Sequence, residues 1–210
     1  MRARAAPDFL VRRLGVLEYE PTWRAMQAFS ASRNAATPDE FWLVQHPPVY
    51  TQGLAGKTEH LLSETAMPVV KTDRGGQITY HGPGQAVVYV LLDMTRRGLK
   101  VRELVRRIEQ AAIAMLTDYG LNGERLNGAP GVYVAGAKIA ALGLRVKGGC
   151  CYHGIALNVD MDLAPYTNIN PCGYAGMRVT QLRDLGVDID TQTAGEALLA
   201  HLARSLKNES

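Results

Sequence analysis

The chain has 210 residues, of which 47% are hydrophobic and 20% charged, and its formal net charge is +3. These values suit one globular domain with a substantial core; the charge is too small to indicate nucleic-acid binding, and the longest apolar run, residues 86–92, is too short to span a membrane. Three cysteines, an odd count, and an Arg-rich N-terminus without a signal-peptide core argue against a disulfide framework and favour the cytoplasm.

The N-terminal half alternates between helix and strand signals. Residues 1–8 are predicted to be a flexible tail that leads into a first strand. In "YEPTWRAMQAFSAS", Pro21 stands where a helix can begin, and Trp23, Met26 and Phe29 fall near one face. "FWLVQH" and "PVVKT" are short strand-like runs, and the continuous apolar run "AVVYVLLDM" is typical of a central strand.

The C-terminal half continues the alternation. Apolar residues keep helical spacing through 101–119, with Gly120 at the position of a C-terminal cap, so we expect this helix to cover a sheet. Glycine-punctuated strands are predicted within 131–146 and 152–160. Thr193 and Glu196 form a capping-box pattern that opens a helix through Leu206. The order of elements predicts an α/β fold, and the absence of repeats or linkers predicts a single domain over 1–210.

The stretch "RGGQITYHGPGQAVVY", residues 74–89, concentrates glycines with Arg74, His81 and Gln85 directly before the predicted central strand. Backbone without side chains can approach a ligand closely, so this stretch is a candidate binding segment. The alternative is a glycine-rich turn whose Arg and His satisfy backbone carbonyls. Its "GGQ" also occurs in peptide-release factors, but the residues that follow do not continue that pattern.

Two residues are candidates for covalent chemistry. In "INPCGYAGM", Cys172 lies between proline and glycine, which present its thiol on an irregular segment, and a thiolate is a good acyl acceptor. Lys138 lies in the apolar run "GAKIAALGL", where loss of solvation favours the neutral amine of a base. The alternatives are a buried structural cysteine and a strand-edge lysine whose ammonium stays in water.

Other polar clusters have simpler interpretations. Cys150, Cys151 and His153 could suggest zinc, but adjacent cysteines lack the usual ligand spacing, so we expect no metal. His81 and His153 are expected to be hydrogen-bonded groups that support the site. A basic set could guide an acidic carrier protein or simply form a solvated helix face; it comprises Arg96, Arg97, Lys100, Arg102, Arg106 and Arg107.

Four blocks in a fixed order, "RGGQITYHGPGQAVVY", "GAKIAALGLRV", "HGIALNVDMDL" and "INPCGYAGM", resemble the lipoyl(octanoyl) transferase family, and the resemblance covers nearly the whole chain. It implies a fold similar to the catalytic domain of biotin and lipoate protein ligases, a mixed sheet flanked by helices. It also implies that octanoyl passes from acyl carrier protein to a cysteine. The acyl group then reaches a specific lysine of lipoyl domains in 2-oxoacid dehydrogenase E2 subunits or the glycine cleavage H protein.

By matching motifs, the resemblance makes Cys172 the acyl-accepting nucleophile and Lys138 its partner. The substrate-binding segments that it implies contain Arg74, Gly75, Gly76, Gln77, Ile78, Thr79, Tyr80, His81, Ala141, Leu142, Gly143, Gly154, Ile155 and Ala156. The chain departs from the pattern in two places. Gln45 replaces an expected acidic residue before "HPPV", and the pair Cys150–Cys151 belongs to no motif of the family.

The role that we expect of Lys138 follows from the proton that the attacking amine must lose. A lysine amine is neutral only about once in 2,500 at pH 7, so the attacking amine must lose a proton. We therefore expect Lys138 to take that proton and return it to the departing sulfur of Cys172. Thioester exchange and amide formation then need no nucleotide, cofactor or metal. The alternatives are an ATP-dependent lipoate or biotin protein ligase, and a non-catalytic module that binds lipoyl domains.

Overall fold

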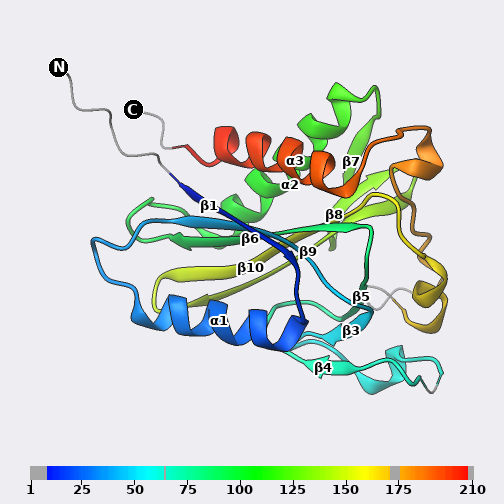
Figure 1. The fold of residues 1–210 in the computed structure, drawn as a ribbon, viewed down its shortest axis with the longest axis horizontal. Helices are drawn as coiled ribbons and strands as arrows, with labels where there is room; N and C mark the ends of the chain where they lie inside the picture. Colours follow the sequence, from blue (N-terminus) through cyan, green and yellow to red (C-terminus); the bar gives the residue numbers. More distant parts are fainter. Residues whose placement is uncertain (1–8, 64, 171–175, 208–210) are drawn as a thin grey trace.

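The computed structural model describes residues 9–63, 65–170 and 176–207, and both the predicted tail at 1–8 and Cys172 lie outside these ranges. Two sheets and three α-helices form the framework (Figure 1). The larger sheet has the order β1 (Leu10–Val16), β2 (Glu40–Gln45), β6 (Gln85–Asp93), β10 (Cys150–Asn158), β9 (Ala137–Lys147), β8 (Ala129–Val134) and β7 (Gly123–Leu126). Among the described residues, only β1 and β2 pair in parallel in this sheet.

The smaller sheet has the order β4 (Val69–Lys71), β3 (Val49–Gln52) and β5 (Ile78–His81). Helices α2 (Val101–Asp118) and α3 (Thr191–Ser205) cover one face of the larger sheet, and α1 (Tyr19–Ser32) covers the other (Figure 1). The predicted α/β class, a mixed sheet flanked by helices, is therefore confirmed. In the part of the chain that the structure describes, no helix has the length and apolarity to cross a membrane.

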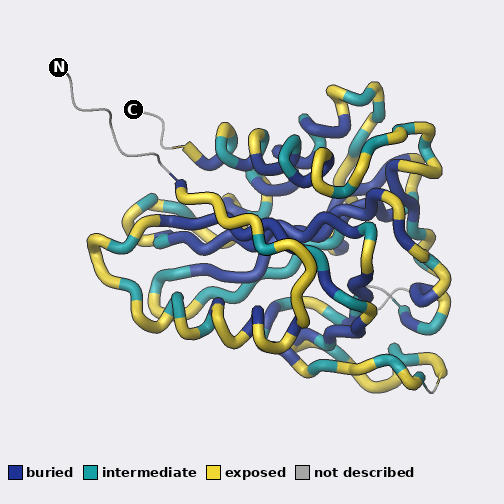
Figure 2. The backbone as a smooth tube through the Cα atoms, viewed as in Figure 1, coloured by how far each residue is buried: buried dark blue, intermediate teal, exposed yellow. Residues whose placement is uncertain are grey.

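Strand β6 lies between the two hydrophobic layers that cover the faces of the larger sheet, and it contributes side chains to both. Val88 and Val90 pack with α2 and α3, whereas Val87 and Tyr89 pack with α1. Successive side chains of a strand point to opposite faces, so a strand between two helical layers must be apolar throughout. The continuous apolar run in the sequence has this cause, and Figure 2 shows the resulting buried strands inside an exposed shell. All nine residues of β6 are at least partly buried.

Helix α1 spans the predicted residues, and α2 ends before Gly120, whose φ of +73° fits the predicted C-terminal cap. The predicted capping box of α3 is wrong. The helix begins at Thr191, and the side chain of Asp190 accepts the backbone N–H of Thr193. Glu196 instead pairs with Arg13 of β1 at 2.5 Å.

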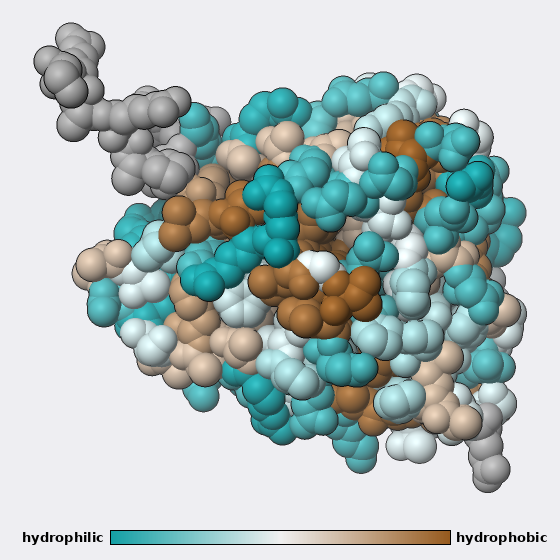
Figure 3. All heavy atoms as spheres, in the orientation of Figure 1, coloured by the Kyte–Doolittle hydropathy of each residue, from teal (hydrophilic) through white to brown (hydrophobic). Residues whose placement is uncertain are grey.

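Edge strand β1 is largely exposed and runs across the front of the molecule (Figure 1). The same face is mainly hydrophilic, with a hydrophobic patch near its centre (Figure 3). Exposed apolar side chains of β1 and the turn after it are Leu10, Val11, Val16 and Leu17. Ion pairs of Arg12 with Glu40 and of Arg13 with Glu196 interrupt this apolar edge with charge, which disfavours pairing with another strand.

A buried acidic residue joins separate segments of the chain. Asp39, whose side chain is fully buried, forms ion pairs with Arg33, Arg96 and Arg97, and it also accepts the backbone N–H of Asp93. The side chain of Arg97 is only 7% exposed. The interpretation of Arg97 as part of a basic surface for a carrier protein is therefore corrected, because its side chain is buried against Asp39. Arg96 also pairs with Asp39 but is exposed, as are Lys100, Arg102 and Arg106 of the same basic set.

Replacing Asp39 by Ala should lower the free energy of unfolding by about 3–5 kcal/mol, because it leaves buried guanidinium groups without their counter-charge. Urea titration followed by circular dichroism measures this loss. The control is Glu20→Ala, which removes the exposed pair with Arg24 and should change stability by less than about 1 kcal/mol. Equal losses in the two variants would contradict a central role for the Asp39 cluster.

Candidate active site

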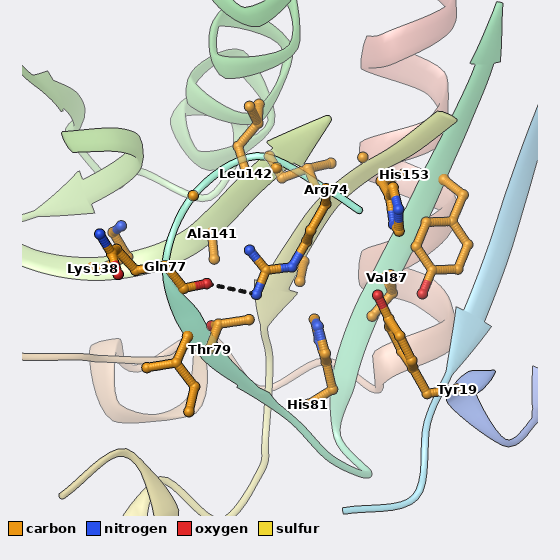
Figure 4. Close-up of a pocket in the computed structure, with 17 residues that line it drawn as sticks. Tyr19, Arg74, Gln77, Thr79, His81, Val87, Lys138, Ala141, Leu142 and His153 are labelled. Atoms are coloured by element: carbon orange, nitrogen blue, oxygen red, sulfur yellow. Dashed lines mark hydrogen bonds between the residues drawn. The ribbon is translucent and has the colours of Figure 1, made fainter. Parts of the chain in front are cut away.

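A pocket opens between the two sheets, and it brings together the segments that the sequence singled out (Figure 4). It encloses about 600 Å³ with its open mouth included. The sequence-predicted residues in its lining are Arg74, Gly76, Gln77, Ile78, Thr79, His81, Lys138, Ala141, Leu142, Gly143, Gly154, Ile155 and Ala156. The segments 141–143 and 154–156 are directly paired across the β9–β10 ladder, so one ladder forms a whole wall.

Among the described residues, two of the predicted substrate-binding residues do not line the pocket. Tyr80 points away from it, because it alternates with Thr79 and His81 along β5, and it packs against Tyr50 and Tyr166. Gly75 lies behind the lining, where its N–H donates to the carbonyl of Leu144 at 2.9 Å. This bond attaches the glycine-rich loop to β9 of the larger sheet.

The glycines permit close backbone contacts that any side chain would block. A Cβ on Gly154 would lie 2.0 Å from the carbonyl oxygen of Val88, and a Cβ on Gly143 would lie 3.1 Å from that of Gly75. The first distance is sterically impossible, and the second would push the loop away from the sheet. These glycines therefore let β10 lie against β6 and the loop lie against β9.

Arg74 holds the glycine-rich loop in shape. Its guanidinium donates to the carbonyls of Thr51, Gly75 and Gln77 at 2.6, 2.9 and 2.9 Å, and to the hydroxyl of Thr51. Figure 4 shows the bond to Gln77 beside the pocket. Arg74 therefore satisfies backbone carbonyls, as one of the two interpretations expected, and its side chain also forms part of the pocket wall.

Aromatic and imidazole rings form the end of the pocket opposite Lys138, where Tyr19, His81 and His153 converge (Figure 4). The rings of Tyr19 and His81 stack with centroids 5.6 Å apart. Burial, with the nearby His46 as a smaller cause, lowers the pKa of His81 to about 3, and burial lowers that of His46 to about 4. Both imidazoles are therefore neutral at pH 7, so this end of the pocket is polar but carries no imidazolium charge from them.

Asp73 orients His153 at the same end. Its carboxylate accepts the Nε2–H of His153 at 3.0 Å and hydrogen bonds from Trp23, Gln27 and Tyr152. Although partial burial opposes ionisation, these bonds hold the pKa of Asp73 well below its usual value. The predicted supporting role of His81 and His153 fits these contacts, and burial lowers the pKa of His153 as well.

Lys138 stands at the other end of the pocket (Figure 4). It is only 3% exposed, so the alternative of a strand-edge lysine in water is wrong. Its Nζ donates to the carbonyl of Pro130 at 3.2 Å and lies 5.1 Å from the ring centre of Tyr133. Its backbone is fixed on both sides, because its N–H donates to Arg178 and its carbonyl accepts the N–H of Thr180.

The segment after Cys172 returns to this end of the pocket: Val179 forms a parallel bridge with Lys138. Cys172 itself lies outside the described residues. The other two cysteines do not resemble nucleophiles. The thiol of Cys151 is buried and donates to the carbonyl of Val90, and burial raises its pKa to about 12. Burial also raises the pKa of Cys150, its neighbour on β10.

Some pocket residues could not be recognised in the sequence. Tyr19, Val87 and Tyr89 line the pocket, but Tyr19 looked like an ordinary first residue of a helix. The uniform burial of β6 removed the alternation that would have marked Val87 and Tyr89. Gln45, the departure noted in the sequence, accepts the backbone N–H of Gly84 at 2.9 Å, so a neutral amide oxygen fulfils a structural role there.

The chain resembles known proteins over nearly its whole length. The model of the lipoyl protein ligase A/B catalytic domain matches residues 18–203. The octanoyltransferase of Dechloromonas aromatica is 58% identical over 201 residues, 96% of this chain and 98% of that protein. The octanoyltransferase of Aromatoleum aromaticum is 62% identical over 200 residues, 95% and 87% of the two chains.

Solved structures share the fold at low sequence identity. A bipartite lipoate protein ligase from Thermoplasma acidophilum, studied with its E2 lipoyl domain, superposes with a TM-score of 0.73 and 17% identity over 94% of this chain and 84% of that one. A biotin protein ligase from Aquifex aeolicus, in complex with biotin and ATP, gives a TM-score of 0.58 and 13% identity over 95% and 70%. From the match over residues 18–203 and the relatives at about 60% identity, the chain belongs to the lipoyl protein ligase A/B catalytic-domain family.

Proposed function

We propose that this chain is an octanoyltransferase of protein lipoylation, which takes octanoyl from acyl carrier protein onto Cys172 and passes it to a lysine of a lipoyl domain. The observation that carries the proposal is the pocket, which has aliphatic walls at Ile78, Leu142 and Ile155 and the buried amine of Lys138 at one end. Aliphatic walls suit a saturated acyl chain, and a buried amine suits proton transfer. Relatives at about 60% identity bear the name octanoyltransferase.

The chemistry balances in two steps. In the first, the Cys172 thiolate attacks the thioester carbonyl, a new S–C bond forms, and the S–C bond to the carrier breaks. The departing carrier thiolate takes up the proton that the Cys172 thiol lost. In the second, the amine of the acceptor lysine attacks, the N–C bond forms, and the Cys172 S–C bond breaks. Lys138 takes the proton of the attacking amine and returns it to the departing sulfur.

The acceptors that we propose are lipoyl domains of 2-oxoacid dehydrogenase E2 subunits and the glycine cleavage H protein. Support comes from the solved lipoate protein ligase with the same fold, which is paired with an E2 lipoyl domain. Intact-mass measurement after mixing with octanoyl-acyl carrier protein, without nucleotide, tests the whole proposal. A protein that stays unmodified, or that needs ATP and free octanoate, would refute it.

Cys172→Ser should abolish the acyl adduct that is stable to denaturing mass spectrometry, because the hydroxyl is a much weaker nucleophile than the thiolate. Cys150→Ala and Cys151→Ala should keep the adduct, since burial raises the pKa of both thiols. Peptide mapping locates the added mass. An adduct on Cys150 or Cys151 would place the nucleophile elsewhere.

Chain-length preference should follow from the aliphatic walls of the pocket. Each buried methylene contributes about 0.8 kcal/mol, so a hexanoyl donor should react about tenfold more slowly than an octanoyl donor, or somewhat worse. The measurement is the second-order rate of adduct formation with donors of different length on the same carrier protein. Equal rates for acetyl and octanoyl donors would show that the pocket does not bind the chain.

Lys138→Arg separates charge from basicity. The guanidinium remains positive but cannot accept a proton at neutral pH, so the thioester should still form while transfer to the lipoyl domain falls by about 10²–10⁴. A time course of both species by intact mass, with Lys138→Ala alongside, should show the octanoyl thioester accumulating. Full transfer in Lys138→Arg would remove Lys138 from the role of general base.

A further inference from the structure

One peptide group links Lys138 to a buried carboxylate on the neighbouring helix. The carbonyl of Pro130 accepts the Nζ–H of Lys138 at 3.2 Å. The N–H of the same peptide, which belongs to Gly131, donates to Oε1 of Glu109 at 3.0 Å. Because a trans peptide is planar, with its C=O and N–H on opposite edges, Lys138 and Glu109 lie on opposite sides of this group.

Glu109 is itself firmly held. It lies on α2 and is only 6% exposed, although acidic residues are rarely buried unless they are paired. Its second oxygen accepts the Nε–H of Arg125 at 3.0 Å, and the Arg125 guanidinium also donates to the carbonyl of Arg106 and the side chain of Gln110. The carboxylate therefore has a fixed position, with Oε1 directed at Gly131.

Gly131 allows the peptide to lie close to Lys138. Its φ is +134°, and a Cβ at this position would lie 2.5 Å from the carbonyl oxygen of Ala140 and 3.4 Å from Nζ of Lys138. Glycine is therefore required both by the backbone conformation and by the space. The contact between this peptide and the lysine is built into the local fold.

A carboxylate that accepts from a peptide N–H polarises that peptide and strengthens its carbonyl as an acceptor, because chains of hydrogen bonds reinforce one another where water is excluded. We propose that Glu109 is a positioning residue for Lys138, acting through the Pro130–Gly131 peptide to fix the amine in the pocket. The inference rests on the function proposed above for Lys138. Glu109 touches neither the acyl group nor the acceptor lysine in this scheme.

The test replaces Glu109 by Gln, which keeps an oxygen for Gly131 but removes the negative charge. Transfer from the Cys172 thioester to the lipoyl domain should slow by about tenfold. This is the smaller of the losses that follow when a residue that orients a metal ligand through a hydrogen bond is removed, and Glu109 orients Lys138 in a comparable way. The KM for the lipoyl domain should stay unchanged, and the thioester should accumulate. Glu103→Gln, the same change on an exposed part of α2, is the matched control and should leave both steps unchanged.

A double-mutant cycle separates positioning from a general loss of structure. If Glu109 acts through Lys138, adding Glu109→Gln to Lys138→Ala should reduce the residual transfer no further. A tenfold loss that persists in the Lys138→Ala background, or no loss in Glu109→Gln alone, overturns the inference while leaving the role of Lys138 intact. Full transfer by Lys138→Ala alone overturns both.

A second variant guards against a folding defect. Glu109→Asp keeps the charge but shortens the side chain by one methylene, which moves the carboxylate away from the N–H of Gly131. This variant should give the same selective slowing of transfer. If Glu109→Gln does not fold by circular dichroism, the same cycle is run with Glu109→Asp, and the same outcomes support or overturn the inference.

Discussion

The pocket depends on the guanidinium of Arg74, which ties the glycine-rich loop to the smaller sheet through backbone carbonyls. It binds Thr51 of the smaller sheet and Gln77 of the glycine-rich loop, while the next residue, Gly75, bonds to β9. An Arg side chain offers five donors in a rigid fork, so one residue can fix several carbonyls at once. These bonds hold the loop on both sides although it contains several glycines. The wall formed by residues 141–143 and 154–156 keeps its place opposite that loop.

The two ends of the pocket carry different chemical groups. Burial keeps His81 and His46 neutral, and Asp73 holds His153 through a bond at 3.0 Å, so polar groups gather at one end without imidazolium charge from His46 or His81. Lys138 occupies the other end, buried at 3% exposure. Burial strengthens the electrostatic contacts of Lys138, because little water is present to screen them. Under the proposed function, aliphatic walls hold the acyl chain between these ends and proton transfer is confined to the lysine end.

The fold is shared with ligases, but fold alone does not decide the reaction. The biotin protein ligase in complex with ATP and this chain have the same framework at 13% identity. Under the proposed function, the reaction depends on particular residues: the cysteine between Pro171 and Gly173, and the lysine beside the Pro130 carbonyl. A nucleophile that keeps the energy of a thioester removes the need for an adenylate, so under the proposed function the same framework operates without nucleotide.

The sequence by itself determined the α/β class, the position of α1, the apolar central strand, and the family resemblance, because these depend on local periodicity and contiguous motifs. It also singled out Lys138 and most of the pocket lining. Only the tertiary structure decided the rest. Tyr19 lines the pocket because α1 packs across β10. Arg97 turns inward and pairs with Asp39. The Pro130–Gly131 peptide links Glu109 to Lys138. Each of these contacts joins residues that are far apart in the chain, and their positions are fixed by packing that no local pattern records.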